Sequence, residues 1–233
     1  MKSILSFLFL FFPIALMAQT ESELITNIIQ TMGGEKNWQE IHSSIVTYTM
    51  EGEDFGKATI VKYNSKGKFF RADFQFESRD EKIKNTKYFM LASPLSNKKF
   101  MPDSRDTSVL SGAEIEDLKK NPFLFNPFIN AESQNTEIVF MDMVEEEGKN
   151  YFVFFVNLQN EIQYKYYVDA QTYFIHKSVL YNSEVDEVNI FTDYEKLQEG
   201  IWVPKTITTR AGVLKLTNIK INQPFNSKTF IIK

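Results

Sequence analysis

The sequence predicts a mainly β protein of the α+β class, built on antiparallel strands with only a few helices. From residue 43 onward, segments rich in β-branched and aromatic residues recur at hairpin spacing. Short turns join these segments without intervening helices, which favours antiparallel pairing. Helical periodicity is confined to a stretch before the strands and to one interruption among them. We therefore expect roughly ten to twelve strands in one sheet.

The first eighteen residues have the pattern of a secretory signal peptide. Lys2 is followed by an apolar core over 4–17, and Ala18 supplies a small residue for cleavage. The apolar run is too short for a membrane span, and no stop-transfer segment follows it. We expect residues 1–18 to be removed, which leaves 233 − 18 = 215 residues. The remaining chain, 19–233, should form a single periplasmic domain without an integral membrane span.

Two helices are expected at the start of the mature chain. Thr20 and Glu23 have the spacing of a capping box, and apolar residues then recur at helical intervals. Gly33–Gly34 should end this helix. A short second helix is expected over about 35–42. The apolar period changes to two after it, so the strands begin there.

Alternating polarity predicts which side chains share a face of each strand. In the strand over 69–77, the apolar residues at even positions oppose Arg71 and other polar residues. Two later strands alternate in the same way, whereas Tyr151–Val156 is apolar throughout and should be covered on both faces. The residues expected to share a face are Phe70, Ala72, Phe74 and Phe76; Ile162, Tyr164, Tyr166 and Val168; and Val188, Ile190, Thr192 and Tyr194.

Charge and composition exclude several functional classes. The formal charge of −4 becomes −5 without Lys2, which argues against a nucleic-acid or anionic-membrane partner. The chain has no cysteine, so it has no disulfide, no thiol nucleophile and no acylated anchor. Neither His42 nor His176 is paired with a nucleophile by any sequence feature, and His176 is interpreted as a structural or surface residue. Without a phosphate-binding loop or metal-ligand motif, we expect no enzyme, no cofactor and no metal.

Two weaker signals for chemistry stay open as alternatives. A carboxylate-dependent hydrolase would need a pair drawn from Asp73, Glu77, Asp80 and Glu81, but strand alternation places the first two on a solvated face. The segment 102–106, PDSRD, weakly resembles a calcium-binding loop, although a polar turn explains it more simply.

Aromatic side chains are unusually numerous in the mature chain. Four of the 22 phenylalanines lie in the signal peptide, which leaves 18 beside 10 tyrosines and 2 tryptophans. A curved sheet lined this way needs material on its concave side, and either its own helices or an apolar ligand could supply it. The stretch NPFLFNPFIN, 121–130, gathers five apolar side chains around two prolines. It directly follows a helical segment that Ser111 begins and Pro122 must end.

The order of these features resembles the LolA/LolB lipoprotein-localisation superfamily, especially its divergent outer-membrane lipoprotein-sorting-like members. The similarity is greatest at YVDAQTYFIHK (167–177) and DYEKLQEGIWVPKTI (193–207), where a strand ending in Asp turns into the next strand. A later strand there ends in a Gly followed by a hydrophobic-Pro pair. The resemblance covers most of 20–233. It implies a strongly curved antiparallel sheet that forms an incomplete barrel with helices over its open side.

The resemblance also implies a function. Members of known role carry the acyl chains of lipoproteins across the periplasm or receive them at the outer membrane, and an arginine inside the carrier's barrel helps to hold a lid shut. Arg71 lies in the strand that matches best, but alternation places it opposite Phe70, Phe74 and Phe76. The lid-latching role is therefore not carried over to Arg71. The cysteine that would anchor a LolB-like receptor is absent.

We predict a soluble, non-enzymatic periplasmic carrier that acts as a monomer and binds lipid or lipoprotein acyl chains in an apolar half-barrel cavity. A membrane-bound protein that loads or receives the cargo is a further expected partner. The insertion at about 111–130 is either a mobile lid or a static cap. The alternative function is a secreted β scaffold that binds a protein partner along a sheet edge. The expected lining residues are Phe70, Phe74, Phe76, Ile162, Tyr164 and Tyr166 from the sheet, with Leu118, Phe123, Phe125 and Phe128 from the lid.

Overall fold

The structure is a computed structural model of the chain. It describes residues 20–52, 56–65, 69–77, 87–93, 96–101, 106–111, 126–129, 131, 136–158, 162–181, 187–226 and 229. The predicted signal peptide, 1–18, and most of the predicted insertion, 112–125, lie outside the described residues.

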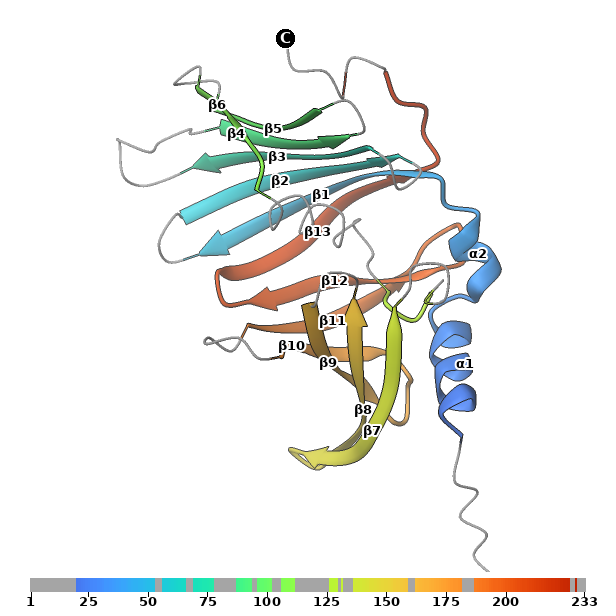
Figure 1. Ribbon diagram of the computed structural model, residues 1–233. Helices are drawn as coiled ribbons and strands as arrows, with labels where there is room; N and C mark the ends of the chain where they lie inside the picture. The colour runs from blue at the N-terminus through green and yellow to red at the C-terminus, as the bar shows by residue number, and fades with distance from the viewer. Residues whose placement is uncertain are drawn as a thin grey trace, which may run out of the picture.

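Thirteen strands form one open antiparallel sheet, in the spatial order β6-β5-β4-β3-β2-β1-β13-β12-β11-β10-β9-β8-β7. The sheet consists of two meanders, β1–β6 and β7–β13, which are joined where β1 pairs with β13. The strand direction turns strongly between the upper and lower parts of the sheet (Figure 1). The strands are β1 (Ser43–Gly52), β2 (Gly56–Ser65), β3 (Phe69–Glu77), β4 (Lys87–Ser93), β5 (Ser96–Met101), β6 (Asp106–Val109), β7 (Glu137–Glu146), β8 (Lys149–Leu158), β9 (Ile162–Asp169), β10 (Ile175–Leu180), β11 (Val188–Lys196), β12 (Trp202–Thr209) and β13 (Gly212–Ile221).

Local sequence explains the hairpins. A two-residue connection joins β7 to β8, where Glu146 pairs with Lys149 across Glu147 and Gly148. Both central residues have positive φ, 52° and 76°, which is the backbone of a primed turn that matches the twist of the strands. The sequence predicted this connection and the one between β2 and β3, where Ser65 pairs with Phe69.

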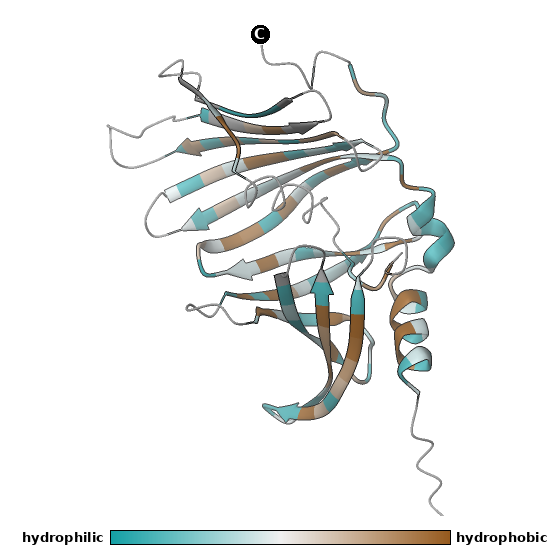
Figure 2. Cartoon of the chain, in the orientation of Figure 1, coloured by the Kyte–Doolittle hydropathy of each residue, from teal (hydrophilic) through white to brown (hydrophobic). Residues whose placement is uncertain are grey.

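Helix α1 (Glu21–Thr31) begins with the predicted capping box. The amide of Glu23 donates to Oγ1 of Thr20 at 3.2 Å, and the amide of Thr20 donates to Oε2 of Glu23 at 2.9 Å. Gly33 has a φ of 116° and turns the chain into α2 (Glu35–Gln39), which is shorter than the predicted 35–42. The apolar face of α1 is directed toward the sheet (Figure 2).

The corner between the two helices is fixed to the turn between β11 and β12. The carbonyl of Met32 accepts from the amide of Trp202 and from Nε1 of Trp38, both at 3.0 Å. A Cβ added to Gly33 would lie only 2.5 Å from the carbonyl oxygen of Gly200. Glycine is therefore needed at position 33 for its φ and for close packing.

Two main clusters of buried apolar residues lie on the side of the sheet that α1 covers, called here the inner face. The helix-covered core joins α1 to β8, β9 and β10 and consists of Leu24, Ile28, Met32, Phe128, Phe154, Val156, Tyr166, Val168 and Ile175. The central core joins β1, β2, β12 and β13 and consists of Val46, Tyr48, Met50, Ala58, Ile60, Ile201, Val203 and Ile221.

The predicted faces hold in β3 and β9 but not in β11. Phe70 and Ala72 in β3, and Tyr166 and Val168 in β9, are all buried. In β11, Phe191 and Tyr194 are three residues apart, yet both pack against the helix-covered core. Asp193 between them has a φ of 56°, and this irregularity breaks the strict alternation predicted for 188–194.

Candidate functional site

The inner face of β1, β2, β3, β12 and β13 carries two adjacent rows of apolar side chains that cross the strands. Cross-strand register defines both rows, because residues directly opposite each other lie on the same face. We call them the apolar rows. The first is Ile207, Leu214, Met50, Ala58 and Phe76, and the second is Leu216, Tyr48, Ile60 and Phe74.

These rows are buried at their centre, where Tyr48 and Ile60 are 4 % and 6 % exposed. Their ends are less closed than the middle of the helix-covered core. Phe154, Val156 and Val168 in the helix-covered core are 0 % exposed beneath α1. At the two ends of the apolar rows, Phe74 and Leu216 are only half-buried. Large apolar side chains that stay partly exposed on an inner face offer contact area for an apolar ligand.

The predicted lining residues that the structure describes fall into three separate clusters. Phe74 and Phe76 pack against the central core, with Phe70 beside them in a small cluster with Ala72 and Leu110. Tyr164, Tyr166 and Phe128 belong to the helix-covered core, where the Phe128 ring lies edge-on to Phe154 at 5.2 Å and to Tyr166 at 6.2 Å. Leu118, Phe123 and Phe125 lie outside the described residues, as does the side chain of Ile162.

The connection from β6 to β7 leads from one edge of the open sheet to the other. Near its start, Leu110 is 4 % exposed and packs with Phe70 and Ala72 on the inner face. Near its end, Phe128 is 2 % exposed in the helix-covered core. The connection therefore contacts the inner face at both of these points, on opposite halves of the sheet.

A turn holds Phe128 in place. The side-chain oxygen of Asn126 accepts from the amide of Phe128 at 3.1 Å, and its carbonyl accepts from the amide of Ile129 at 3.2 Å. Pro127 fixes φ at the first central position of this turn. Residues 126–128 of the stretch 121–130 thus form a rigid turn that directs Phe128 into the helix-covered core.

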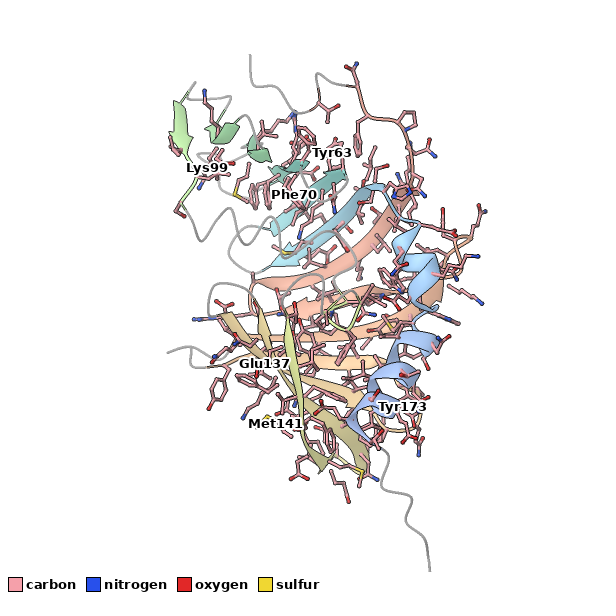
Figure 3. All side chains as sticks on the ribbon, turned by 45° about the vertical axis from the view of Figure 1, so that its right-hand side comes forward. Tyr63, Phe70, Lys99, Glu137, Met141 and Tyr173 are labelled. Carbon is pink, nitrogen blue, oxygen red and sulfur yellow. The ribbon has the colours of Figure 1, made fainter. Side chains whose placement is uncertain are left out.

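Arg71 lies on the outer face, as the alternation predicts. Its Nε contacts Oδ1 of Asp73 at 2.5 Å, and its guanidinium lies 5.8 Å from the centre of the Tyr63 ring. A terminal nitrogen donates to the carbonyl of Thr229 at 2.6 Å, and Phe225 packs against Tyr63. Arg71 therefore holds the C-terminal segment against the outer face and does not point toward the inner one. The register places Arg71 and Tyr63 on the opposite face from Phe70 (Figure 3 labels Tyr63 and Phe70).

Several titratable groups of the described residues have pKa values that their surroundings shift. Burial raises the pKa of Tyr48, Tyr166 and Tyr194, so these phenols stay neutral. Burial also acts to raise the pKa of Asp169, but hydrogen bonds from the amides of Thr172 and Gln171 outweigh it and lower that pKa. These hydrogen bonds cap the turn between β9 and β10.

The carboxylates considered for a hydrolase do not form a pair within the described residues. Asp73 contacts Arg71 on the outer face, and Glu77 is exposed at the end of β3. Asp80, Glu81 and residues 102–105 of the possible calcium loop lie outside the described residues, and Asp106 begins β6. No group of three or more His, Asp or Glu side chains suited to a metal occurs in the described part of the chain.

Sequence reasoning missed the inner-face residues of β1 and β13. Val46, Tyr48 and Met50 alternate with more polar residues in SSIVTYTM, so period-two alternation could have identified them. The pairing of β13 with β1 skips one residue of β13, because Thr47 pairs with Asn218 and Tyr48 pairs with Leu216. Leu216 and Ile219 therefore lie on the same face although they are three residues apart. No alternation rule would find that pair.

The sequence matches no protein-family model and no curated protein. Similar solved structures, in contrast, cover almost the whole chain. A protein of the DUF1329 family from Desulfovibrio piger has a TM-score of 0.59 at 12 % identity, over 90 % of this chain and 96 % of its own. A LolA superfamily protein from Nitrosomonas europaea has a TM-score of 0.54 at 11 % identity, over 88 % and 96 %. The chain has the LolA-like fold.

A third structure extends the same similarity. A domain described as a candidate outer membrane lipoprotein-sorting protein from Vibrio parahaemolyticus has a TM-score of 0.53 at 13 % identity, over 89 % of this chain and 94 % of its own. At such low identity, the likeness concerns the LolA-like fold and not the side chains of any site. Within the described residues, no helix has the length and apolar character needed to cross a membrane.

Proposed function

We propose that this protein is an exported, non-enzymatic carrier that binds the acyl chains of lipids or lipoproteins on the inner face of its LolA-like sheet. The observation that carries the proposal is the pair of apolar rows, whose terminal side chains Phe74 and Leu216 stay half-buried. The fold itself supports the same reading, because a LolA superfamily protein and a candidate lipoprotein-sorting domain share it.

The energetics suit a carrier that binds and releases. Each methylene removed from water contributes about 0.8 kcal/mol, so a sixteen-carbon chain gains on the order of 12 kcal/mol. Ordering the chain and displacing whatever covers the apolar rows offset much of this gain. A moderate net affinity lets a membrane-bound partner load or unload the cargo.

We further propose that residues 111–130 form the cover of the apolar rows. The connection contacts the inner face near both ends, at Leu110 and Phe128, so the shortest route between these points crosses the inner side. Phe128 would then be the anchor, while Leu118, Phe123 and Phe125 would meet the cargo. The cover either opens for cargo or stays as a static cap beside it.

Native mass spectrometry of the protein purified from the periplasm of the producing cell tests the carrier. We expect a co-purifying acylated species of definite mass. The substitution Phe76→Asp puts a charge on the inner face and should abolish that species. Gln75→Asp is the matched control, because Gln75 is exposed on the outer face of the same strand. A clean protein mass in both the wild type and the control would contradict the proposal.

Hydrogen exchange across 111–130, with and without a bound lipid, distinguishes the two kinds of cover. A mobile lid should exchange faster when lipid binds and displaces it, whereas a static cap should exchange slowly in both samples. The turn at 126–129 is an internal reference, since Phe128 is packed in the core.

A second candidate function, binding a protein partner along a sheet edge, is favoured by β7. This strand is the end of the sheet, ten residues long, and Val139, Met141 and Met143 on it are 41 %, 51 % and 53 % exposed. Its four charged residues are all carboxylates, so a basic, apolar segment of a partner would suit it (Figure 3 labels Glu137 and Met141).

The edge is partly protected. The carboxylate of Glu21 accepts from the amide of Phe140, and that of Asp142 accepts from the amide of Met143, each at 2.7 Å. A photocrosslinking residue at Met143 should capture one defined partner in cells if the edge is a docking strand. The same residue at exposed Glu199 is the control, and identical products from both positions would exclude edge docking.

A further inference from the structure

Lys62 and Lys99 lie on the inner face beside the apolar rows. Cross-strand register aligns Lys62 of β2 with buried Val46 on one side and buried Ala72 on the other, and continues through Met90 to Lys99 of β5. Val46 and Ala72 are 0 % and 1 % exposed, which assigns both lysines to the inner face. Lys98, the neighbour of Lys99, is exposed on the outer face (Figure 3 labels Lys99 in the upper part of the sheet).

The next row along the strands is polar as well. Ser44 of β1 lies directly opposite Asn64 of β2, two residues from Lys62 on the same face. Ser44 is 1 % exposed, and its hydroxyl oxygen has no hydrogen-bond partner within the described part of the chain. A buried hydroxyl without a partner is costly, and an oxygen of a ligand would satisfy it.

The inner face is therefore amphipathic along the strands. The apolar rows lie toward the arrowhead of β1, near Met50, and the polar corner of Ser44, Lys62 and Asn64 lies toward its start (Figure 1). A half-buried ammonium on an apolar surface needs a partner. Lys62, Asn64 and Lys99 each already have an interaction partner within the chain. A ligand would share or replace that partner.

We propose that this polar corner binds the anionic headgroup of an amphiphilic cargo whose acyl chains lie on the apolar rows. The inference rests on the proposed carrier function and adds the class of cargo and its orientation. Lys62 supplies the charge, and Asn64 and Ser44 donate hydrogen bonds to phosphate or carboxylate oxygens. Opposite residues are about 5 Å apart at Cβ and next-but-one residues about 7 Å apart, which a single phosphate can bridge. Lys99, three strands from Lys62, supplies a second positive charge.

Titration with three fluorescent probes that share one acyl chain tests the proposal. The probes are a phosphatidylglycerol, a free fatty acid and an uncharged diacylglycerol. We expect Lys62→Gln to weaken binding of the phosphatidylglycerol about tenfold, with a smaller loss for Lys99→Gln, and to leave the diacylglycerol unchanged. A larger effect on the fatty acid than on the phosphatidylglycerol would identify a carboxylate as the headgroup.

Lys57→Gln and Lys98→Gln are the matched controls, because these lysines lie on the outer face of the same two strands. Lys62→Met removes the charge but keeps the length of the side chain. It therefore separates loss of the charge from loss of packing at this position. Equal loss for charged and uncharged probes, or no loss at all, overturns the headgroup site while the carrier function stands. Failure of the wild type to bind any probe overturns the carrier function itself.

Discussion

The two halves of the inner face differ in how their apolar side chains are covered. In the lower half, α1 contributes Leu24, Ile28 and Met32, and the sheet residues beneath them are sealed from solvent. In the upper half, among the described residues, α2 contributes Trp38 and neighbouring Ile41 at one end of the central core, and the ends of the apolar rows remain half-buried. One half is built for stability. The upper half leaves apolar surface partly exposed, and we propose that the ligand binds there.

The difference arises from the length and placement of the helices. Helix α1 has eleven residues and a complete capping box, so it can lay a continuous apolar stripe along β8, β9 and β10. Helix α2 has five residues and no side-chain cap, too short to cover more than one corner. Substitutions in each half test this difference.

The largest effect is expected from truncating a side chain beneath α1. Phe154→Ala should lower the free energy of unfolding by about 3–5 kcal/mol, because Phe154 is fully buried and a cavity would remain. Phe76→Ala, in the open half, should lower it by only about 1 kcal/mol, since its ring is already part-exposed. Urea denaturation of both variants measures the contrast. Equal losses would mean that the two halves are equally closed.

A smaller effect is expected where α1 is attached to the sheet. Gly33→Ala should lower the free energy of unfolding by about 3 kcal/mol, because its Cβ would collide with the backbone of Gly200 and Ile201. Gly148→Ala is the control, since that residue also has positive φ but no atom within 4 Å of an added Cβ. The control should lose about 1 kcal/mol. Thermal melts compare the two, and a similar loss would reduce the effect at Gly33 to backbone conformation alone.

The smallest effect concerns the outer face of the lower half and depends on pH. Burial, with nearby Lys149 and Lys177, lowers the pKa of His176 below 6.5 while its ring stacks on Tyr151 at 5.0 Å. Because the folded pKa is the lower one, the neutral imidazole stabilises the fold above pH 6.5, and this contribution is lost as the pH falls below that value.

His176→Phe should therefore flatten the decline in stability between pH 7 and pH 5. The difference should be about 0.5 kcal/mol, because the ring is only partly shielded from solvent. Urea denaturation of the wild type and the variant at both pH values measures it. An unchanged slope in the variant would assign the pH dependence to other groups.

Much of this architecture could be predicted from local patterns. The capping box at Thr20 and Glu23, the turn at Glu147–Gly148 and the alternation in β3 each follow from a few neighbouring residues. The antiparallel sheet follows from short turns without intervening helices, and the LolA-like fold was implied by the resemblance to the LolA/LolB superfamily. The described part of the chain contains thirteen strands where ten to twelve were predicted, because short strands such as β5 and β6 have little sequence signal of their own.

The candidate site was harder to predict for physical reasons. Its members come from β1, β2, β3, β12 and β13. The register between β1 and β13 joins segments that are far apart in the sequence. Irregularities at Asp193 and beside Thr47 also change which residues share a face. The sequence analysis placed Tyr166 and Phe70 in one lining, but the structure places them in separate clusters. Separating them required knowledge of where α1 lies on the sheet, and no local pattern contains it.

The pairing of β1 with β13 has a consequence for how the chain assembles. Every other strand pair is formed by consecutive strands, whereas Ser44 must find Ile221 near the far end of the sequence. Closing so long a loop is entropically unfavourable until neighbouring contacts exist, which slows folding. The two meanders should therefore acquire structure independently and zip together last, and a newly synthesised chain has no complete apolar rows until its final strand has emerged.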